Sequence, residues 1–323
     1  MKKISISMFI MVVLIFIAGQ ILIESESILK SVSLAFNIWK NNIFPSLFPF
    51  FVLSELLINY GFIEFLGELF KPIMNCLFKV KGVCAFIFIM SIISGIPSNA
   101  KYIRELYLSE SIDEIEASKM LMFTHFSNPL FILGTVSIIF LNNKKVGILI
   151  LISHYITNII IGFLFRNYHP TSEKEKKISL KNAVLNMHNK RINQSKNFIS
   201  ILTNALINSI NTLLLILGVI TFFLCLTTII DKNVNLNPLT QGILNGLFEM
   251  TQGLKYISVL DFSLKIKATF FTMLISFGGL SGHIQVMGIL SDTKIKYWPF
   301  LISRIIHALI SALIVFISFN FVI

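Results

Sequence analysis

The stretch Ser94-Gly95-Ile96-Pro97-Ser98-Asn99-Ala100-Lys101 interrupts an apolar run of the chain with small, kinking and polar residues. A plain membrane helix would continue through this position with apolar side chains. Proline and glycine instead free backbone groups from helical hydrogen bonding, which is tolerated at membrane depth only where protein or a cavity satisfies those groups. We therefore take this break as the feature around which the rest of the chain is organised.

The composition indicates a polytopic membrane protein. Of the 323 residues, 55% are hydrophobic and only 13% charged, and the mean hydropathy is +0.80. A soluble domain carries roughly a quarter charged residues. The net charge of +11 lies in the short links between apolar runs and not on a solvated domain, which disfavours a nucleic-acid partner and is typical of membrane orientation.

No sequence signature of catalysis or nucleotide binding is present, since the chain lacks HExxH, a Walker loop, GxSxG and GxGxxG. Cys76, Cys84 and Cys225 lie in or beside apolar segments without C-x-x-C spacing, which is typical of buried small hydrophobic residues. We expect a transporter and not an enzyme, with no cofactor and no metal.

The chain divides into four parts. Residues 1–24 hold two lysines and an apolar run long enough to span the bilayer, so we expect a first transmembrane span with the N-terminus in the cytoplasm. Residues 25–166 form a first repeat and residues 198–323 a second. Between them, residues 167–197 form a basic linker, whose excess of lysine and arginine predicts a cytoplasmic position.

The two repeats are predicted from matched breaks. Placing Gly95 over Gly279 aligns two small-residue breaks, each of which follows an apolar run. In this alignment the second copy lacks a counterpart to much of residues 113–146. The first copy starts outside and the second inside, so the fold class expected is an all-α membrane protein with two inverted repeats and broken or re-entrant helices.

The number of crossings limits the topology. Residues 25–42 have the pattern of an interfacial helix, and Pro45 and Pro49 predict an interruption in the next span. Four plausible spans lie between residues 24 and 166, whereas the charge pattern requires an odd number. Either residues 62–79 also cross, or one break is a re-entrant hairpin.

Ordered motifs in both halves carry a family resemblance. They are Phe48-Pro49-Phe50-Phe51 with Glu55, Ser94-Gly95-Ile96-Pro97 with Ala100-Lys101, Ser127-Asn128-Pro129-Leu130-Phe131, His154-Tyr155 with Asn158, Gly278-Gly279-Leu280-Ser281 with His283 and Gln285, and Arg304 with His307. Over nearly the whole chain this order resembles the YlbJ-type sporulation integral membrane proteins of endospore-forming bacteria. One departure is Ile96, where an aromatic residue is expected before the proline.

The resemblance implies a nucleoside-recognition gate domain and an architecture similar to that of concentrative nucleoside transporters. It also implies passage of dipicolinic acid, a small aromatic dicarboxylate, across the mother-cell-derived membrane of the forespore by alternating access. Two alternatives stay open: a cation-coupled nucleoside permease, and a membrane scaffold for spore-envelope proteins. The expected partners are a small-molecule anion and the lipid bilayer, and a homo-oligomer is compatible with the sequence.

An aromatic dianion needs hydrogen-bond donors and positive potential, and ionisable residues inside a membrane often serve function. The residues that we expect to bind substrate are Ser94, Gly95, Ser98, Asn99, Lys101, Ser127, Asn128, Gly279, Ser281, His283, Gln285 and Arg304. Those that could carry a coupling proton are Glu55, His154 and His307. For each of them the alternative is structural: snorkelling for the cations, and hydrogen bonds to broken backbone or between helices for the others.

Overall fold

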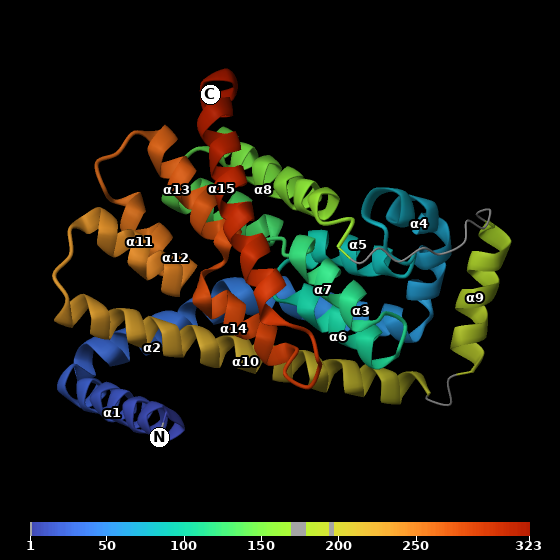
Figure 1. The fold of residues 1–323 in the computed structure, drawn as a ribbon, viewed down its shortest axis with the longest axis horizontal. Coiled ribbons are helices and arrows are strands. Elements are labelled where there is room, and N and C mark those ends of the chain that lie inside the picture. Colours follow the sequence, from blue (N-terminus) through green and yellow to red (C-terminus); the bar gives the residue numbers. More distant parts are fainter. Residues whose placement is uncertain (1, 169–178, 194–196) are drawn as a thin grey trace.

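The computed structural model describes residues 2–168, 179–193 and 197–323, and every regular element in this part of the chain is a helix (Figure 1). The elements are α1 (Lys2–Ile23), α2 (Ser25–Ile38), the π-helix η1 (Trp39–Ile43), α3 (Phe44–Asn59), α4 (Phe62–Phe78), α5 (Cys84–Ser94), α6 (Ser98–Leu108), α7 (Glu114–Phe123), the π-helix η2 (Phe131–Phe140), α8 (Lys144–Leu164), α9 (Leu180–Ile192), α10 (Phe198–Asn233), α11 (Pro238–Phe248), α12 (Met250–Ser258), α13 (Leu264–Phe277), α14 (Gly279–Ile289) and α15 (Tyr297–Val322).

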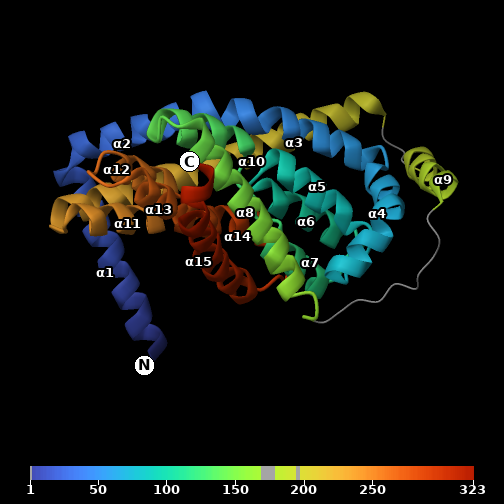
Figure 2. The ribbon, with the colours of Figure 1, turned by 90° about the horizontal axis from the view of Figure 1, so that it is seen from above.

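Six helical stretches in the described residues are long and apolar enough to cross a membrane: Ile4–Ile23, Ser25–Asn59, Lys144–Leu164, Phe198–Asn233, Leu264–Ile289 and Tyr297–Val322. None of the first stretch is buried inside the protein. In Figure 2, α1 projects away from the remaining helices. An all-helical membrane protein is therefore confirmed, and its first apolar segment forms the helix that the sequence predicts.

Residues 25–59 correct one prediction, because they form one continuous helical stretch and not an interfacial helix followed by an interrupted span. Pro45 is the second residue of α3 and follows the π-helical turn Trp39–Ile43 almost directly, so it lies inside the continuous stretch. Pro49 lies inside α3, and the π-helical turn Trp39–Ile43 lies one to two turns earlier. Local widening of this kind lets a helix continue past a proline.

Helices α5 and α6 fold back on each other as a hairpin. Each has 11 residues and is only about 16 Å long, too short to span the bilayer. The rings of Phe86 and Tyr102 lie 5.5 Å apart, and the Tyr102 hydroxyl lies 3.0 Å from Ser94 Oγ. The stretch that opens the sequence analysis is therefore the tip of a hairpin.

A second hairpin is formed by α11 and α12, which pack closely on each other. Its tip is Glu249, which has an extended backbone and receives the N–H of Gln252 on its side chain as the N-cap of α12. The sequence carries no local signal for this tip, because one extended residue between two helices needs neither proline nor glycine.

Two further helices are interrupted, but the chain continues in the same direction after each interruption. Residues 124–128 separate α7 from η2, and Gly278 separates α13 from α14 in the left-handed conformation. Each broken helix follows a hairpin in the chain and precedes a long helix, α8 in the first repeat and α15 in the second. Both repeats therefore contain a long helix, a hairpin, a broken helix and a final span.

This order corrects the register of the repeat. The tip at Gly95 corresponds to the tip at Glu249, and the break at residues 124–128 corresponds to the break at Gly278. The contacts between the repeats follow the same correspondence. Helix α6 packs on α14 as α12 packs on η2, and α7 packs on α15 as α13 packs on α8. Residues 113–146 thus have a counterpart, and among the described elements of the two repeats α4 has none.

Residues 25–59 and α8 are long and apolar enough to cross a membrane. If α7 and η2 together make a third crossing and the α5–α6 hairpin makes none, the number is odd, as the charge pattern requires. The inverted orientation of the second repeat stays a prediction. The long helices α2–α3 and α10 lie side by side along one flank of the molecule (Figure 2).

The basic linker contains a docked helix. Helix α9 packs against α4, and the backbone of Met187 lies so close to Gly61 that an added Cβ atom would be 2.6 Å from its carbonyl oxygen. Lys190 lies 3.4 Å from Glu64, and Arg191 stacks over the ring of Tyr60. The prediction of a cytoplasmic position for residues 167–197 stays a prediction, and residues 169–178 and 194–196 lie outside the described residues.

Candidate solute pocket

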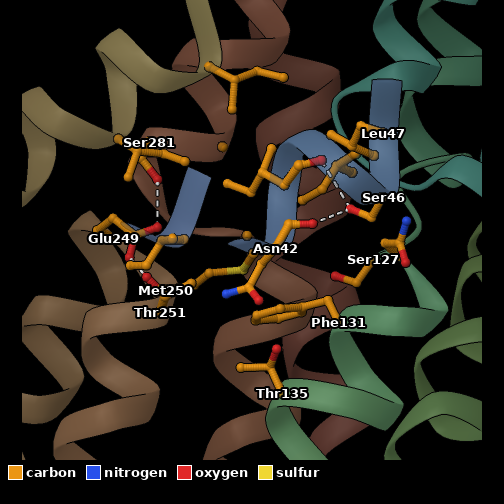
Figure 3. Close-up of a pocket in the computed structure, with 18 of the residues that line it drawn as sticks. Asn42, Ser46, Leu47, Ser127, Phe131, Thr135, Glu249, Met250, Thr251 and Ser281 are labelled. Atoms are coloured by element: carbon orange, nitrogen blue, oxygen red, sulfur yellow. Dashed lines mark hydrogen bonds between the residues drawn. The ribbon is translucent and has the colours of Figure 1, made fainter. Parts of the chain in front are cut away.

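The two hairpin tips and the two helix breaks converge on one pocket of about 540 Å³ (Figure 3). Its remaining walls come from the α2–α3 stretch and from α10, which contribute mostly apolar side chains and the amides of Asn41 and Asn42. A cavity of this size holds a small organic molecule, and a few convergent polar groups in apolar walls are typical of a solute site.

The pocket faces the starts of four helices. The lining residues at these starts are Ile96 and Pro97 before α6, Ser127, Asn128, Leu130 and Phe131 at the start of η2, Glu249 to Gln252 at the start of α12, and Gly278 and Ser281 at the start of α14. Among the described residues, none from α5, α7, α11 or α13 lines it. Since helix N-termini present free N–H groups and positive dipole ends, the backbone contribution here favours negative charge.

Glycine is required where each tip meets the break of its own repeat. Gly95 has a φ of +77°, and a Cβ atom there would be 2.5 Å from the backbone nitrogen of Asn128. Gly279 has a φ of +63°, and a Cβ atom there would be 3.1 Å from the nitrogen of Met250. The Asn128 side chain also donates to Ser94 O, at 3.1 Å. Each tip is thereby locked to its break, which places both on the pocket.

Ser127 presents a buried hydroxyl without a partner. It is 1% exposed and lines the pocket, and its Oγ has no hydrogen bond among the described residues. Its backbone N–H donates to His154 Nε2 at 2.9 Å, which holds the residue in place. In Figure 3, Ser127 lies beside Phe131 at the wall of the pocket. A buried hydroxyl of this kind is available to a solute.

Glu249 places a carboxylate in the same pocket, which sequence reasoning missed. It is 2% exposed, accepts from the Gln252 N–H at 3.0 Å and from the Thr251 hydroxyl, and lies 3.5 Å from Ser281 Oγ (Figure 3). No lysine or arginine of the described residues is in ion-pair contact with it. An acid in a segment without glycine or proline at the break carried no local signal.

Lys101 lies away from the pocket lining and pairs with Glu55. Its Nζ is 2.9 Å from Glu55 Oε2, and the other carboxylate oxygen accepts from the amide of Asn208. Lys101 is on α6, Glu55 on α3 and Asn208 on α10, so these three residues tie the first hairpin to both long helices. In the second repeat, Asp231 of α10 accepts from Asn245 of α11 at 3.0 Å.

Arg304 is fully buried behind the break of α7. It donates to Met122 O and His125 O, which are the carbonyl groups freed at that break, and to Asn158 Oδ1 at 3.3 Å. His307 Nδ1 lies 2.8 Å from the same guanidinium. Arg304 therefore satisfies broken backbone, and it is not part of the pocket lining.

The histidines also make protein contacts. His307 Nε2 donates to His154 O at 2.9 Å. His154 accepts from Ser127 N on Nε2 and bonds Ser276 on Nδ1, and thus connects the break of the first repeat to α13 of the second. His283 contacts Phe277 O and Tyr297 Oη, each at 2.9 Å.

The predicted binding residues thus divide into two groups. Ser127, Asn128, Ser281 and Gln285 line the pocket. The others lie behind it or in the tip: Ser94, Gly95, Ser98, Asn99, Lys101, Gly279, His283 and Arg304.

At one end of the molecule an ion pair joins the two repeats. Arg104 of α6 makes a two-pronged contact with Asp292, which follows α14, and its Nε lies 2.8 Å from Oδ1. The hydrogen bonds from Arg104 lower the pKa of Asp292. The pair is partly exposed, so we expect it to add little to the free energy of unfolding and mainly to position α6 relative to the end of α14.

Comparison with known proteins identifies the family of the chain. The family model described as Gate, nucleoside recognition, matches residues 42–221, more than half of the chain. The chain is 34% identical over 325 residues to the sporulation integral membrane protein YlbJ of Bacillus subtilis (strain 168), with 93% of this chain and 80% of that protein covered. No solved structure matches. These two similarities show that the chain belongs to the nucleoside-recognition Gate family of integral membrane proteins.

Proposed function

We propose that the protein transports a small solute by alternating access through the pocket where the four interruptions meet. The observation that carries the proposal is this convergence, because inverted repeats with interrupted helices around one central site are the plan of secondary transporters. The two tips lie on the same pocket as the long helices, so a movement of hairpins and broken helices against those helices would expose the solute to either side.

The solute that we propose is dipicolinic acid, a flat aromatic dianion. Four helix N-termini and the unpartnered hydroxyl of Ser127 supply donors for carboxylate groups, and Phe131 and Phe140 supply aromatic wall. Lys255, exposed on α12, adds a cation at the lining. By analogy with the sporulation relative, the membrane would be the mother-cell-derived membrane around the forespore, with the N-terminus in the cytoplasm.

Dipicolinate flux in proteoliposomes tests the proposal. Purified protein should carry labelled dipicolinate across the bilayer at a saturable rate, and empty liposomes should not. In cells, a null strain should leave dipicolinate in the mother cell and produce spores that lack it. Normal spore dipicolinate in the null strain, together with no flux in vesicles, would contradict the proposal.

A second candidate is a cation-coupled nucleoside permease, which is favoured by one observation. Glu249 places a carboxylate in the pocket, and carboxylates accept hydrogen bonds from ribose hydroxyl groups but repel a dianion. Competition separates the two candidates: excess uridine should block labelled dipicolinate uptake only if nucleosides occupy the same pocket, and labelled uridine should itself be taken up.

A further inference from the structure

A second, smaller cavity lies between α4, α5 and α8, and we call it the α4–α8 groove. Its volume is about 210 Å³, and every residue that lines it is apolar: five come from α4, three from α5, and Ile159 from α8. The rings of Phe78 and Phe88, which belong to the lining, lie 5.7 Å apart. Ile73, Leu77 and Ile159 are exposed, so the groove opens to the outside of the protein. In a membrane protein such an opening faces hydrocarbon chains.

Cationic side chains lie at one end of this groove, where α4 and α8 both end. The Arg166 guanidinium donates to Cys76 O at 2.6 Å, and Cys76 directly precedes the lining residue Leu77. Lys119 Nζ donates to Lys79 O at 2.9 Å and to Arg166 O at 3.0 Å. This ammonium group joins the end of α4 to the end of α8, and it therefore brings Lys79 and Arg166 together beside the groove.

Among the described residues, no acid is in ion-pair contact with Lys79 or Arg166. Lys79 Nζ donates to the neutral Asn167 Oδ1 at 2.7 Å, in an exposed position. The Arg166 guanidinium donates to a backbone carbonyl group, and its buried Nε has no hydrogen-bond partner in the described part of the chain. Capping of the two helix ends accounts for Lys119, but it leaves donors of Lys79 and Arg166 available to an anion.

We propose that the α4–α8 groove binds an acyl chain of an anionic phospholipid, whose phosphate lies at Lys79 and Arg166. An apolar groove that ends in cations matches the amphipathic shape of such a lipid, and basic pockets between membrane helices are typical sites for anionic headgroups. A free anion would use the cations without the groove, and a lipid without net charge would gain less from the cations. The two features together therefore select the anionic lipid, whatever solute the central pocket carries.

A lipid in this groove would contact three elements of the first repeat at once. Helix α4 packs on both α5 and α8, and it lies at one end of the molecule (Figure 2). The bound chain would fill the space between α4 and these two helices, and would hold α4 against the first hairpin. Because a ligand that binds the folded state stabilises it, anionic lipid should raise the melting temperature of the full chain more than neutral lipid does.

Native mass spectrometry of the full chain tests the site with two lipids that share dioleoyl chains. The wild type should hold its most tightly bound phosphatidylglycerol about tenfold or more tightly than phosphatidylcholine, because each cation near an anionic lipid contributes about fivefold. Lys79→Gln with Arg166→Gln should remove this preference. Lys144→Gln with Lys145→Gln, two exposed lysines at the other end of α8, is the matched control and should keep it.

The groove itself is tested by Ile159→Trp, which fills it with a larger apolar side chain. This variant should bind phosphatidylglycerol about tenfold more weakly, because an acyl chain then loses its apolar contacts. Ile152→Trp, at an exposed position of α8 outside the lining, should bind it as the wild type does. If the glutamine variants do not fold, this pair of variants still tests the site.

Equal binding of the two lipids by the wild type, or an unchanged preference in the double glutamine variant, would overturn the site. Wild-type affinity in Ile159→Trp would overturn the groove as the place of the acyl chain. Displacement of phosphatidylglycerol by glycerol phosphate, which carries the phosphate without chains, would identify a site for a free anion and would likewise overturn the proposal.

Discussion

Ser127 is the residue that most directly links local geometry to solute binding. Its hydroxyl is buried, unpartnered and part of the pocket wall. Ser127→Ala removes a donor without breaking a protein hydrogen bond, so we expect dipicolinate to bind about tenfold more weakly at nearly unchanged melting temperature.

Ser137→Ala is the matched control for Ser127. Ser137 is equally buried, lies outside the pocket lining and donates to Asn143 O at 3.1 Å. Its replacement should lower the melting temperature and leave the dissociation constant for dipicolinate unchanged. Calorimetry on the two purified variants gives both quantities, and a wild-type affinity in Ser127→Ala would contradict the role of its hydroxyl.

Gly95→Ala should destabilise the tip of the first hairpin. The left-handed φ of +77° and the 2.5 Å approach of Asn128 N oppose any side chain, and strain of this kind costs about 1–3 kcal/mol. Gly134→Ala in η2 is the control, because nothing lies within 4 Å of the added methyl group. Thermal unfolding in detergent should show a lower melting temperature for Gly95→Ala only. Equal melting temperatures for the two variants would show that the backbone at the tip shifts to accommodate a methyl group.

At the scale of elements, an ion pair holds the first hairpin on the long helix α3. Lys101→Met leaves Glu55 buried and without its cation, which should cost about 3–5 kcal/mol of unfolding free energy. Replacing both residues, as Glu55→Gln with Lys101→Met, should recover most of that loss, and denaturant unfolding measures all three proteins.

The same double variant tests whether Lys101 binds solute. If Lys101 acts only on Glu55, dipicolinate affinity in the double variant should equal that of the wild type. A loss of affinity at recovered stability would instead support the substrate role that the sequence predicts for Lys101.

The element boundaries show where sequence patterns suffice. Glycine and proline mark the tip at Gly95 and the break at Gly278, because both need backbone conformations that other residues avoid. The tip at Glu249 carries no such residue, and Pro49 predicts a break that the structure does not contain. A proline signal depends on whether the preceding turn can widen, which tertiary packing determines.

At the scale of the whole molecule, Arg104 and Asp292 join the first hairpin to the second repeat. Asp292→Asn should lower stability by about 0.2–1 kcal/mol, as is usual for an exposed pair. The pKa of Asp292 is lowered in the folded protein, so its contribution is complete above the unfolded pKa of about 4 and disappears as the pH falls through the folded value.

Thermal unfolding between pH 7 and pH 2 measures this contribution. The difference between wild type and Asp292→Asn should be constant from pH 7 to about pH 5 and vanish at the acid end. A difference that persists to pH 2 would mean that Asp292 acts through a contact independent of its charge.

The sequence by itself determined the membrane class, the repeat of a broken architecture, the family and the position of the first break, because hydropathy, glycine and proline act locally. It did not determine the register of the repeat or which polar residues line the pocket. Lys101 pairs with Glu55, which is 46 residues away in the sequence. Arg304 donates to the freed carbonyl groups at the end of α7, which are more than 170 residues away. Only the tertiary structure decides such pairings, because they join residues that are far apart in the sequence. Since Lys101 and Arg304 bond to other parts of the protein, the polar groups at the pocket are those of Ser127, Glu249 and the helix N-termini.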